Sequence, residues 1–337
     1  MEQVRLKLVR TNPPTICSQT DRSVCCPLPS TTTTTTSTTK PSPSRSMQRI
    51  SEQKCREYGK SVIQITKVAS LMLGEPHVDI VVDKCKHKSV SLIVGGTEAS
   101  LAEFPHQALL GYNNGEPSEW GCGGSLISPK FVLTAAHCLS PRGFGNVKFV
   151  RLGMSSRSQN DNSTLTFGVT EIIQHPNYNS KTFNEDIGLL RLNATVPINE
   201  YILPICMPTK LYNPNKAIAS GFGRTGYQRS TSDKLLKVTL EKFTHAECQE
   251  AFGTAITVTN DTMLCYGHHT ESKDSCSGDS GGPLQIYNDN EVKCTYTQIG
   301  VVSFGLKQCG TVGTPGVYVN VYNYLDWIEK IVWAGES

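Results

Sequence analysis

From residue 93 to the end of the chain, short apolar runs alternate with clusters of Gly, Asn, Pro and Ser. The apolar runs are residues 107–112, 125–127, 131–136, 149–152, 188–192, 235–240, 297–303 and 316–321. Many short strands at regular intervals are typical of an all-β sandwich or barrel. Near the end, Leu325, Ile328 and Val332 fall at helical spacing, which predicts an amphipathic helix over residues 321–333.

The first part of the chain has a different texture, and its composition divides it into three segments. Residues 1–27 hold three cysteines, Cys17, Cys25 and Cys26. Residues 28–54 are rich in Thr, Ser and Pro, which predicts an extended, disordered linker with potential O-glycosylation. Residues 55–92 have a mixed composition; from residue 48 onward we expect little regular structure beyond a short helix near residues 51–64. Residues 93–337 then form the main domain.

Composition and charge exclude several classes of function. The 337 residues carry 32 basic and 29 acidic side chains, a net charge of +3, which is too small a bias to indicate a nucleic acid or an acidic membrane surface as partner. No apolar run approaches the ~18 residues that a membrane span needs.

Thirteen cysteines without a Cys-x-x-Cys pair indicate disulfides in an oxidising compartment, and glycosylation sequons at Asn162, Asn193 and Asn260 agree with secretion. The first residues contain no signal-peptide core, so we expect that the natural amino terminus is missing.

The segment around Ser280, Gly278-Asp279-Ser280-Gly281-Gly282, has the composition of a nucleophile turn. Glycines leave the hydroxyl exposed and let backbone N–H groups face the same point, as acyl transfer requires. The spacing also fits the elbow of α/β-hydrolases, in which the histidine follows the serine. None of the eight histidines lies after Ser280, which excludes that class.

A histidine and an aspartate complete the candidate site. His137 follows the apolar run 131–136, and Asp186 precedes the apolar run 187–192. Each residue alone is more often structural than catalytic. Together with Ser280, they occur in the chain order His, Asp, Ser that chymotrypsin-type enzymes use.

Four segments resemble the signature segments of chymotrypsin-fold serine proteases, and the resemblance covers residues 93–337. The segments are Ile93-Val94-Gly95-Gly96, Thr134-Ala135-Ala136-His137-Cys138, Asp186-Ile187-Gly188-Leu189-Leu190 and Gly278-Asp279-Ser280-Gly281-Gly282-Pro283. This resemblance implies two six-stranded antiparallel β-barrels with the active site between them. It also implies that Ser280 is the nucleophile, that His137 is the base and that Asp186 orients the imidazole. The N–H groups of Gly278 and Ser280 would form the oxyanion hole.

The same resemblance assigns a trypsin-like substrate class. Asp274, six residues before Ser280, would lie at the base of the specificity pocket, where its carboxylate pairs with a substrate Arg or Lys. Gly305 and Gly316 would leave that pocket open to a long side chain. The segment from Ser303 to Gly305 would bind the extended substrate by strand addition.

Activation is expected to follow cleavage of the Leu92–Ile93 bond. The new ammonium group of Ile93 would pair with Asp279 and order the site. Because the bond follows a leucine, we expect no self-activation, and an upstream protease that prefers apolar residues.

The resemblance also implies a disulfide framework. Cys122–Cys138, Cys248–Cys265 and Cys276–Cys309 would close loops, and Cys85–Cys206 would tether the light chain. By elimination, Cys55 would pair with Cys294. The three remaining cysteines, at 17, 25 and 26, look like the second half of an arthropod clip domain, so the chain resembles the snake-like clip-domain proteases of arthropod haemolymph, truncated in its clip domain.

We expect no cofactor and no metal. In the stretch 159–165, where calcium-binding relatives place acidic residues, this sequence has only Asp161. Pro315 stands where sodium-activated relatives carry an aromatic residue, so we expect no control by sodium. The sequence therefore predicts a secreted, monomeric protease zymogen in an extracellular cascade of immune or developmental signalling. Its expected partners are a downstream zymogen as protein substrate, an upstream activator and a serpin-type inhibitor. A digestive trypsin and a catalytically silent adaptor are the alternatives.

Overall fold

The computed structural model divides the chain into two units, residues 1–46 and 47–337, and describes only parts of the second. The described residues are 48–69, 77–85, 97–112, 119–141, 143–158, 162–223, 230–254, 256–270, 279–288, 292, 294–306 and 312–336. Several sequence predictions lie outside them: the clip remnant, most of the linker, Leu92, Ile93, Asp274, Cys276, Gly278 and Cys309. Within the described residues, no helix is long and apolar enough to cross a membrane.

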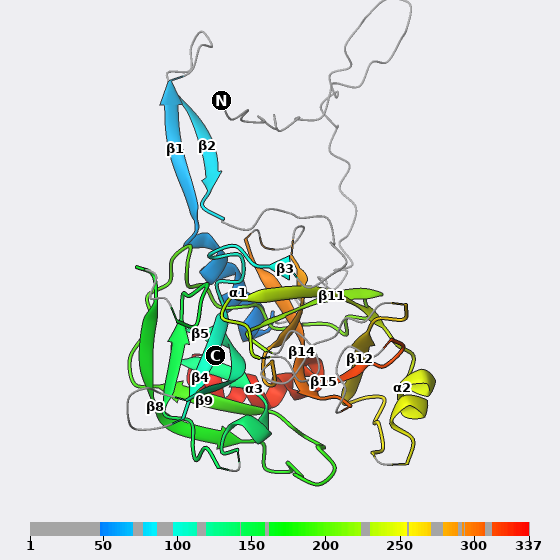
Figure 1. The fold of residues 1–337 in the computed structure, drawn as a ribbon. Helices are drawn as coiled ribbons and strands as arrows, with labels where there is room; N and C mark the ends of the chain where they lie inside the picture. Colours follow the sequence, from blue (N-terminus) through cyan, green and yellow to red (C-terminus); the bar gives the residue numbers. More distant parts are fainter. Residues whose placement is uncertain are drawn as a thin grey trace, which may run out of the picture. The chain divides into compact units, whose positions relative to one another are not determined.

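The first half of the main domain is a closed antiparallel β-barrel, in the order β4-β5-β6-β9-β8-β7 (Figure 1). Its strands are β4 (Gln107–Gly111), β5 (Trp120–Ser128), β6 (Phe131–Thr134), β7 (Phe149–Leu152), β8 (Leu165–Gln174) and β9 (Gly188–Leu192). Leu110, Leu126, Val132 and Leu190 are fully buried and fill the barrel. A Cβ at Gly124 would lie 2.8 Å from a methyl group of Val132, so a glycine is required for this close strand packing.

The second half is also a six-stranded barrel, in the order β10-β13-β14-β15-β12-β11, closed by the pairing of β10 with β11. Its strands are β10 (Lys216–Gly221), β11 (Leu236–Lys242), β12 (Met263–Gly267), β13 (Pro283–Tyr287), β14 (Tyr296–Phe304) and β15 (Gly316–Asn320). The short β3 (Thr97–Glu98) adds to the outer edge of β11. Two six-stranded antiparallel barrels are the predicted fold, which is confirmed.

The carboxyl-terminal helix is also confirmed. A 3₁₀ turn, η2 (Val321–Tyr324), leads into α3 (Leu325–Val332), and Leu325, Ile328 and Val332 are its buried residues. A second helix in this half, α2 (His245–Phe252), was not predicted. It begins with a capping box, in which Thr244 and Glu247 each bond the backbone N–H of the other.

The amino-terminal helix α1 (Ile50–Lys60) packs on the carboxyl-terminal end of the chain. Arg49 forms ion pairs with Asp326 and, at 2.9 Å, with Glu329. The buried indole Nε1 of Trp333 donates a 3.3 Å hydrogen bond to the hydroxyl of Tyr58. The helix begins inside the segment 28–54 that composition assigned to the linker, and its range is close to the predicted 51–64.

A two-stranded hairpin follows α1, where we expected little regular structure. β1 (Ile63–Ala69) pairs antiparallel with β2 (His77–Asp83). Its base is fixed on both sides, because Val62 is buried and Cys85 forms a disulfide. The expectation was wrong because both segments are rich in β-branched residues, which favour strands, although several of their aliphatic side chains are exposed.

The disulfides that tether the amino-terminal segment differ from the predicted pairs. Cys55 bonds Cys206, and Cys85 bonds Cys294, with Cα separations of 5.1 and 5.4 Å. The predicted Cys85–Cys206 and Cys55–Cys294 pairs are therefore wrong. The physical reason is that α1 places Cys55 against the segment that holds Cys206, while the hairpin delivers Cys85 to Cys294; neither placement is encoded in the cysteine spacing. Cys122–Cys138 and Cys248–Cys265 are joined as expected.

Candidate active site

His137 is delivered to the site by the first barrel. The buried strand β6 ends at Thr134, and a short 3₁₀ turn, η1 (Ala136–Cys138), presents the imidazole. The backbone N–H of His137 donates to Asp186 Oδ1 at 2.9 Å, and its Nδ1 lies 2.7 Å from Asp186 Oδ2. Two contacts to one carboxylate fix both the position of the residue and the orientation of its ring.

Asp186 is fully buried, just before β9. It lies at the centre of a tight turn in which the N–H of Ile187 donates to the carbonyl of Glu185 at 2.8 Å. Glu185 has a positive φ of 58°, a strained conformation for a residue with a side chain. A buried carboxylate needs partners, and the described structure supplies them from the imidazole and from the second barrel.

The second barrel contributes Ser303, near the end of β14. Its hydroxyl donates a 2.5 Å hydrogen bond to Asp186 Oδ2, the oxygen that also faces His137. This bond joins residues 117 positions apart and links the two barrels at the candidate site. The sequence predicted Ser303 as a substrate-binding residue; the structure also gives its side chain a contact to Asp186.

Ser280 lies against the strands that deliver the histidine. Its carbonyl accepts a 2.8 Å bond from the N–H of Gly123 in β5. The next residue, Gly281, has a φ of 79°, and a Cβ there would lie 2.2 Å from the Thr134 hydroxyl. The Ser280 turn therefore packs directly beside the end of β6.

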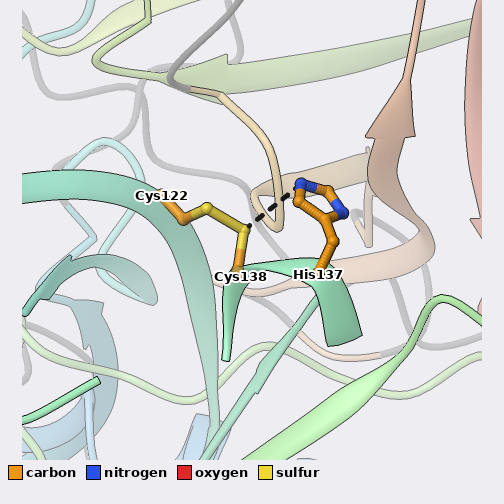
Figure 2. A group of neighbouring side chains, drawn as sticks. All are labelled: Cys122, His137 and Cys138. Atoms are coloured by element: carbon orange, nitrogen blue, oxygen red, sulfur yellow. Dashed lines mark hydrogen bonds between the residues drawn. A yellow bond between two sulfur atoms is a disulfide. The ribbon is translucent and has the colours of Figure 1, made fainter. Parts of the chain in front are cut away.

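Among the described residues, no hydrogen bond joins the Ser280 hydroxyl to His137. The Nε2 atom of the imidazole instead faces the Cys122–Cys138 disulfide, 3.6 Å from Cys138 Sγ, as Figure 2 shows.

Asp279 sits in a close-fitting site formed by two glycines. Its carboxylate accepts a 2.7 Å bond from the N–H of Gly223. A Cβ at Gly221 would lie 2.0 Å from Asp279 Oδ1, and one at Gly223 would lie 2.4 Å from its carboxyl carbon. Only glycine at these two positions admits the carboxylate, which is the predicted acceptor of the activation switch.

Gly305 and Gly316 face each other at the ends of β14 and β15. A Cβ on Gly305 would be 4.0 Å from the Cα of Gly316, and among the described residues no other atom outside its chain neighbours would be as close. Their side-chain-free surfaces leave room beside the site. The acid expected at the base of that pocket, Asp274, and the expected oxyanion donor Gly278 lie outside the described residues.

An aromatic cluster that no sequence motif predicts lies beside the imidazole. The ring of Phe183 lies 6.1 Å from that of His137 and 5.2 Å from that of Phe304, which in turn lies 5.6 Å from Phe252. Phe183 has a positive φ of 57°. The three residues come from separate segments, a loop, the end of α2 and the end of β14, and form no sequence motif, so only the folded arrangement identifies the cluster.

A second histidine lies close behind the carboxylate turn. His175 Nδ1 is 3.7 Å from Glu185 Oε2, and its ring contacts those of Tyr324 and Trp327 edge-on. Burial lowers the pKa of His175, an effect that the neighbouring Glu185 opposes. The group is therefore held towards its neutral form.

Two groups of side chains have metal-ligand composition, Cys122 with His137 and Cys138, and Asp83 with Cys85 and Cys294. In both groups the two sulfur atoms form a disulfide. Thiolates are the zinc-binding form of cysteine, so neither group has the donor set of a structural zinc site.

Comparison with known proteins identifies a family. A family model described as Trypsin matches residues 93–328. Serine protease snk of Drosophila melanogaster is 35% identical over 298 residues, which cover 85% of this chain and 66% of that protein. Melanization protease 1 of the same organism is 38% identical over 72% of this chain and 66% of its own length.

Phenoloxidase-activating factor 1 of Holotrichia diomphalia is 38% identical over 70% of this chain and 69% of its own length. The chain thus spans about two thirds of the length of these relatives.

Proposed function

Because the chain belongs to the trypsin family, and within it to the arthropod clip-domain serine proteases, we propose that it is a secreted serine endopeptidase zymogen of an extracellular cascade. The observation that carries the proposal is the pairing of His137 with the fully buried Asp186 at 2.7 Å, on a loop that packs beside Ser280. A buried carboxylate that orients an imidazole next to a glycine-flanked serine is the arrangement for nucleophilic acyl transfer.

The residues divide the chemistry as follows. Asp186 holds His137 with Nδ1 protonated, which leaves Nε2 as the base that accepts the proton of the Ser280 hydroxyl. The serine oxygen attacks the peptide carbonyl, and His137 then returns the proton to the leaving amine. The N–H groups of Gly278 and Ser280 stabilise the oxyanion. Ser303 supports this arrangement by its bond to Asp186.

We propose cleavage after Arg or Lys. Asp274 supplies the carboxylate for the substrate cation, and the facing glycines Gly305 and Gly316 supply the space for a long side chain. The backbone at Ser303 and Gly305 binds the substrate as an added strand.

Activation by cleavage at Leu92–Ile93 is supported by the site around Asp279. The absence of side chains at Gly221 and Gly223 leaves room for the carboxylate of Asp279, the residue before Ser280, and the N–H of Gly223 bonds it. Insertion of a new ammonium group at Asp279 would couple the cut to the geometry of Ser280. The activator is an upstream protease with a preference for apolar residues.

The relatives support the place of the protein in a cascade. Their names include a melanization protease and a phenoloxidase-activating factor. By this likeness, the substrate is a downstream zymogen, the inhibitor is of the serpin type and the compartment is the haemolymph. A digestive trypsin is disfavoured because two disulfides and α1 retain an amino-terminal segment.

A catalytically silent adaptor is the alternative from another class. To separate the two, the chain would be cut after residue 92 and treated with an irreversible serine-directed inhibitor. The proposal expects labelling at Ser280 and hydrolysis of arginyl but not phenylalanyl substrates. Ser280→Ala should remove labelling and hydrolysis, and Asp274→Ser should remove the preference for arginine. An unlabelled, inactive wild-type chain with Ile93 as its new amino terminus would identify an adaptor.

A further inference from the structure

Two aromatic rings that the proposed mechanism does not use lie beside η1, the turn that presents His137. The rings of Tyr112 and Phe144 are 5.7 Å apart and meet edge-on. Tyr112 is buried, whereas Phe144 leaves 43% of its surface exposed. An exposed phenylalanine that leans on a buried ring forms an apolar surface that is open on one side.

The loop holds Phe144 in this position. It is closed at its base by a 3.0 Å bond from the N–H of Val147 to the carbonyl of Leu139, and both of these residues are buried. Gly143 and Gly145, on either side of Phe144, both have positive φ, which favours a tight turn at the tip. The exposed ring therefore lies at the tip of a loop that is closed at its base.

This aromatic pair is tied to the reacting residues through η1 and β5. The Tyr112 hydroxyl donates a 3.0 Å bond to the carbonyl of Cys138, the neighbour of His137. The Tyr112 ring lies against Gly121, where a Cβ would be 2.8 Å from it. Two residues along β5, Gly123 bonds the carbonyl of Ser280. Two residues of strand span about 7 Å, which is also the reach of two residues of an extended substrate.

The path of the substrate backbone across the site can be inferred from what the two ring nitrogens of His137 face. Nδ1 faces Asp186 and Ser303, the side on which the proposed substrate strand lies before the cleaved bond. Nε2 faces the Cys122–Cys138 disulfide (Figure 2). A substrate peptide that approaches from the Asp186 side and crosses Ser280 therefore continues past the Cys122–Cys138 disulfide, towards Gly121 and the aromatic pair.

We propose that the exposed face of Phe144, supported by the buried Tyr112, forms a subsite that binds an aliphatic side chain of the second residue after the cleaved bond. This inference rests on the proposed function, whose substrate it narrows to proteins with Arg or Lys before the bond and an apolar residue after it. A zymogen whose own activation bond is followed by residues such as Ile93 and Val94 meets this requirement.

The test compares substrates with and without a leaving-side residue. The full chain would carry an enteropeptidase recognition sequence in place of residues 88–92, so that cleavage releases Ile93. Two peptides with Arg before the bond would differ only in Val or Asp at the second position after it. Arginyl-aminocoumarin, which has no amino acid on the leaving side, is the internal reference.

For Phe144→Ala we expect the kcat/KM ratio of the Val peptide to the Asp peptide to fall about fivefold or more, because an aliphatic contact is lost. Hydrolysis of arginyl-aminocoumarin should not change. Tyr322→Ala, which truncates an exposed aromatic residue in η2, is the matched control and should leave all three rates unchanged. An unchanged Val-to-Asp ratio in Phe144→Ala, or an equal loss on all three substrates, would overturn the subsite.

A binding measurement separates this inference from the proposed function. In the cut Ser280→Ala chain, fluorescence anisotropy should show tighter binding of the Val peptide, and Phe144→Ala should remove that preference. If the wild-type chain hydrolyses nothing, the proposed function fails, and this measurement still decides the subsite. Equal affinity of the two peptides would reject it.

Discussion

Glu329 of the carboxyl-terminal helix accepts hydrogen bonds from the side chains of both Arg49 and Ser51, at 2.9 and 2.5 Å. The two donors lie about 280 residues away in sequence, at the start of α1. Glu329 is therefore one of the points at which the segment before the proposed activation bond attaches non-covalently to the protease domain. The attachment is independent of the two disulfides.

Replacing this carboxylate should loosen the amino-terminal helix. Glu329→Gln is expected to lower the free energy of unfolding by about 1–3 kcal/mol, because the charge-assisted hydrogen bonds from Arg49 and Ser51 are weakened at a largely shielded site. Urea denaturation followed by fluorescence measures the change. In the control, Glu241→Gln removes an ion pair with Lys216 in which both side chains are at least 30% exposed, and the change should be under about 1 kcal/mol. Equal effects of the two variants would contradict a special role for Glu329.

The disulfide pairing predicts how the cut chain behaves. After cleavage at residues 92 and 93, the amino-terminal fragment is held by both Cys55–Cys206 and Cys85–Cys294. Removal of either disulfide alone, by paired Cys→Ser substitutions, should leave the two fragments joined on a non-reducing gel. Removal of both should release the fragment. Release by the loss of one disulfide would show that the other does not form.

Ser303 should support catalysis through Asp186. Ser303→Ala is expected to lower kcat/KM roughly tenfold, because a hydrogen bond to a charged group contributes about 1.5 kcal/mol or more. Ser156→Ala is the matched control, since Ser156 is also fully buried and donates a 2.7 Å bond to a carboxylate, that of Asp233. It should affect stability without affecting kcat/KM. The same loss of kcat/KM in both variants would indicate a general structural effect.

Gly281 should tolerate no side chain. A Cβ there would meet the Thr134 hydroxyl at 2.2 Å and the Gly123 carbonyl at 2.6 Å, and φ is 79°. Gly281→Ala is therefore expected to cost about 3 kcal/mol or more, through backbone strain and steric overlap together. Gly335 has a similar φ of 82° with open space around it, so Gly335→Ala should cost only about 1 kcal/mol. Thermal denaturation measures both, and similar shifts would refute the steric argument.

Burial of His175 predicts a loss of stability in mild acid. Its pKa is lowered in the folded state, so below pH 6.5 the unfolded chain binds more protons at this site than the folded chain does. Stability therefore falls as the pH decreases through this range. His175→Gln should reduce the slope of unfolding free energy against pH between about 7 and 5. Substitution of the exposed His245 should not, and an unchanged slope in His175→Gln would disprove the assignment.

The strands that could be predicted from the sequence were those with a continuous apolar run. The strands at residues 107–111 and 188–192 were predicted from short apolar runs, since their side chains are mostly buried and leave an unmixed pattern. β8 was missed because it is largely half-exposed and reads as polar. β13 was missed because it begins directly after the Ser280 motif, at Pro283, where the residues were interpreted as a catalytic turn.

The site was predictable in its residue types but not in its supporting contacts. His137 and Asp186 stand next to recognisable strands, so their motifs could be read. The positions of Phe183 and Phe144, by contrast, depend on which segments the fold brings against His137 and Tyr112. The disulfide partner of Cys85 could not be predicted for the same reason, because it depends on the path of the backbone and not on the number of cysteines.

The attachment of α1 by ion pairs and by Cys55–Cys206 has a spatial consequence for the proposed enzyme. Cleavage at residues 92 and 93 would activate the protease while the amino-terminal segment stays attached to it. Any surface or molecule that captures the amino-terminal region would therefore concentrate proteolysis at the place of capture, and the enzyme would act as a bound source and not as a freely diffusing one.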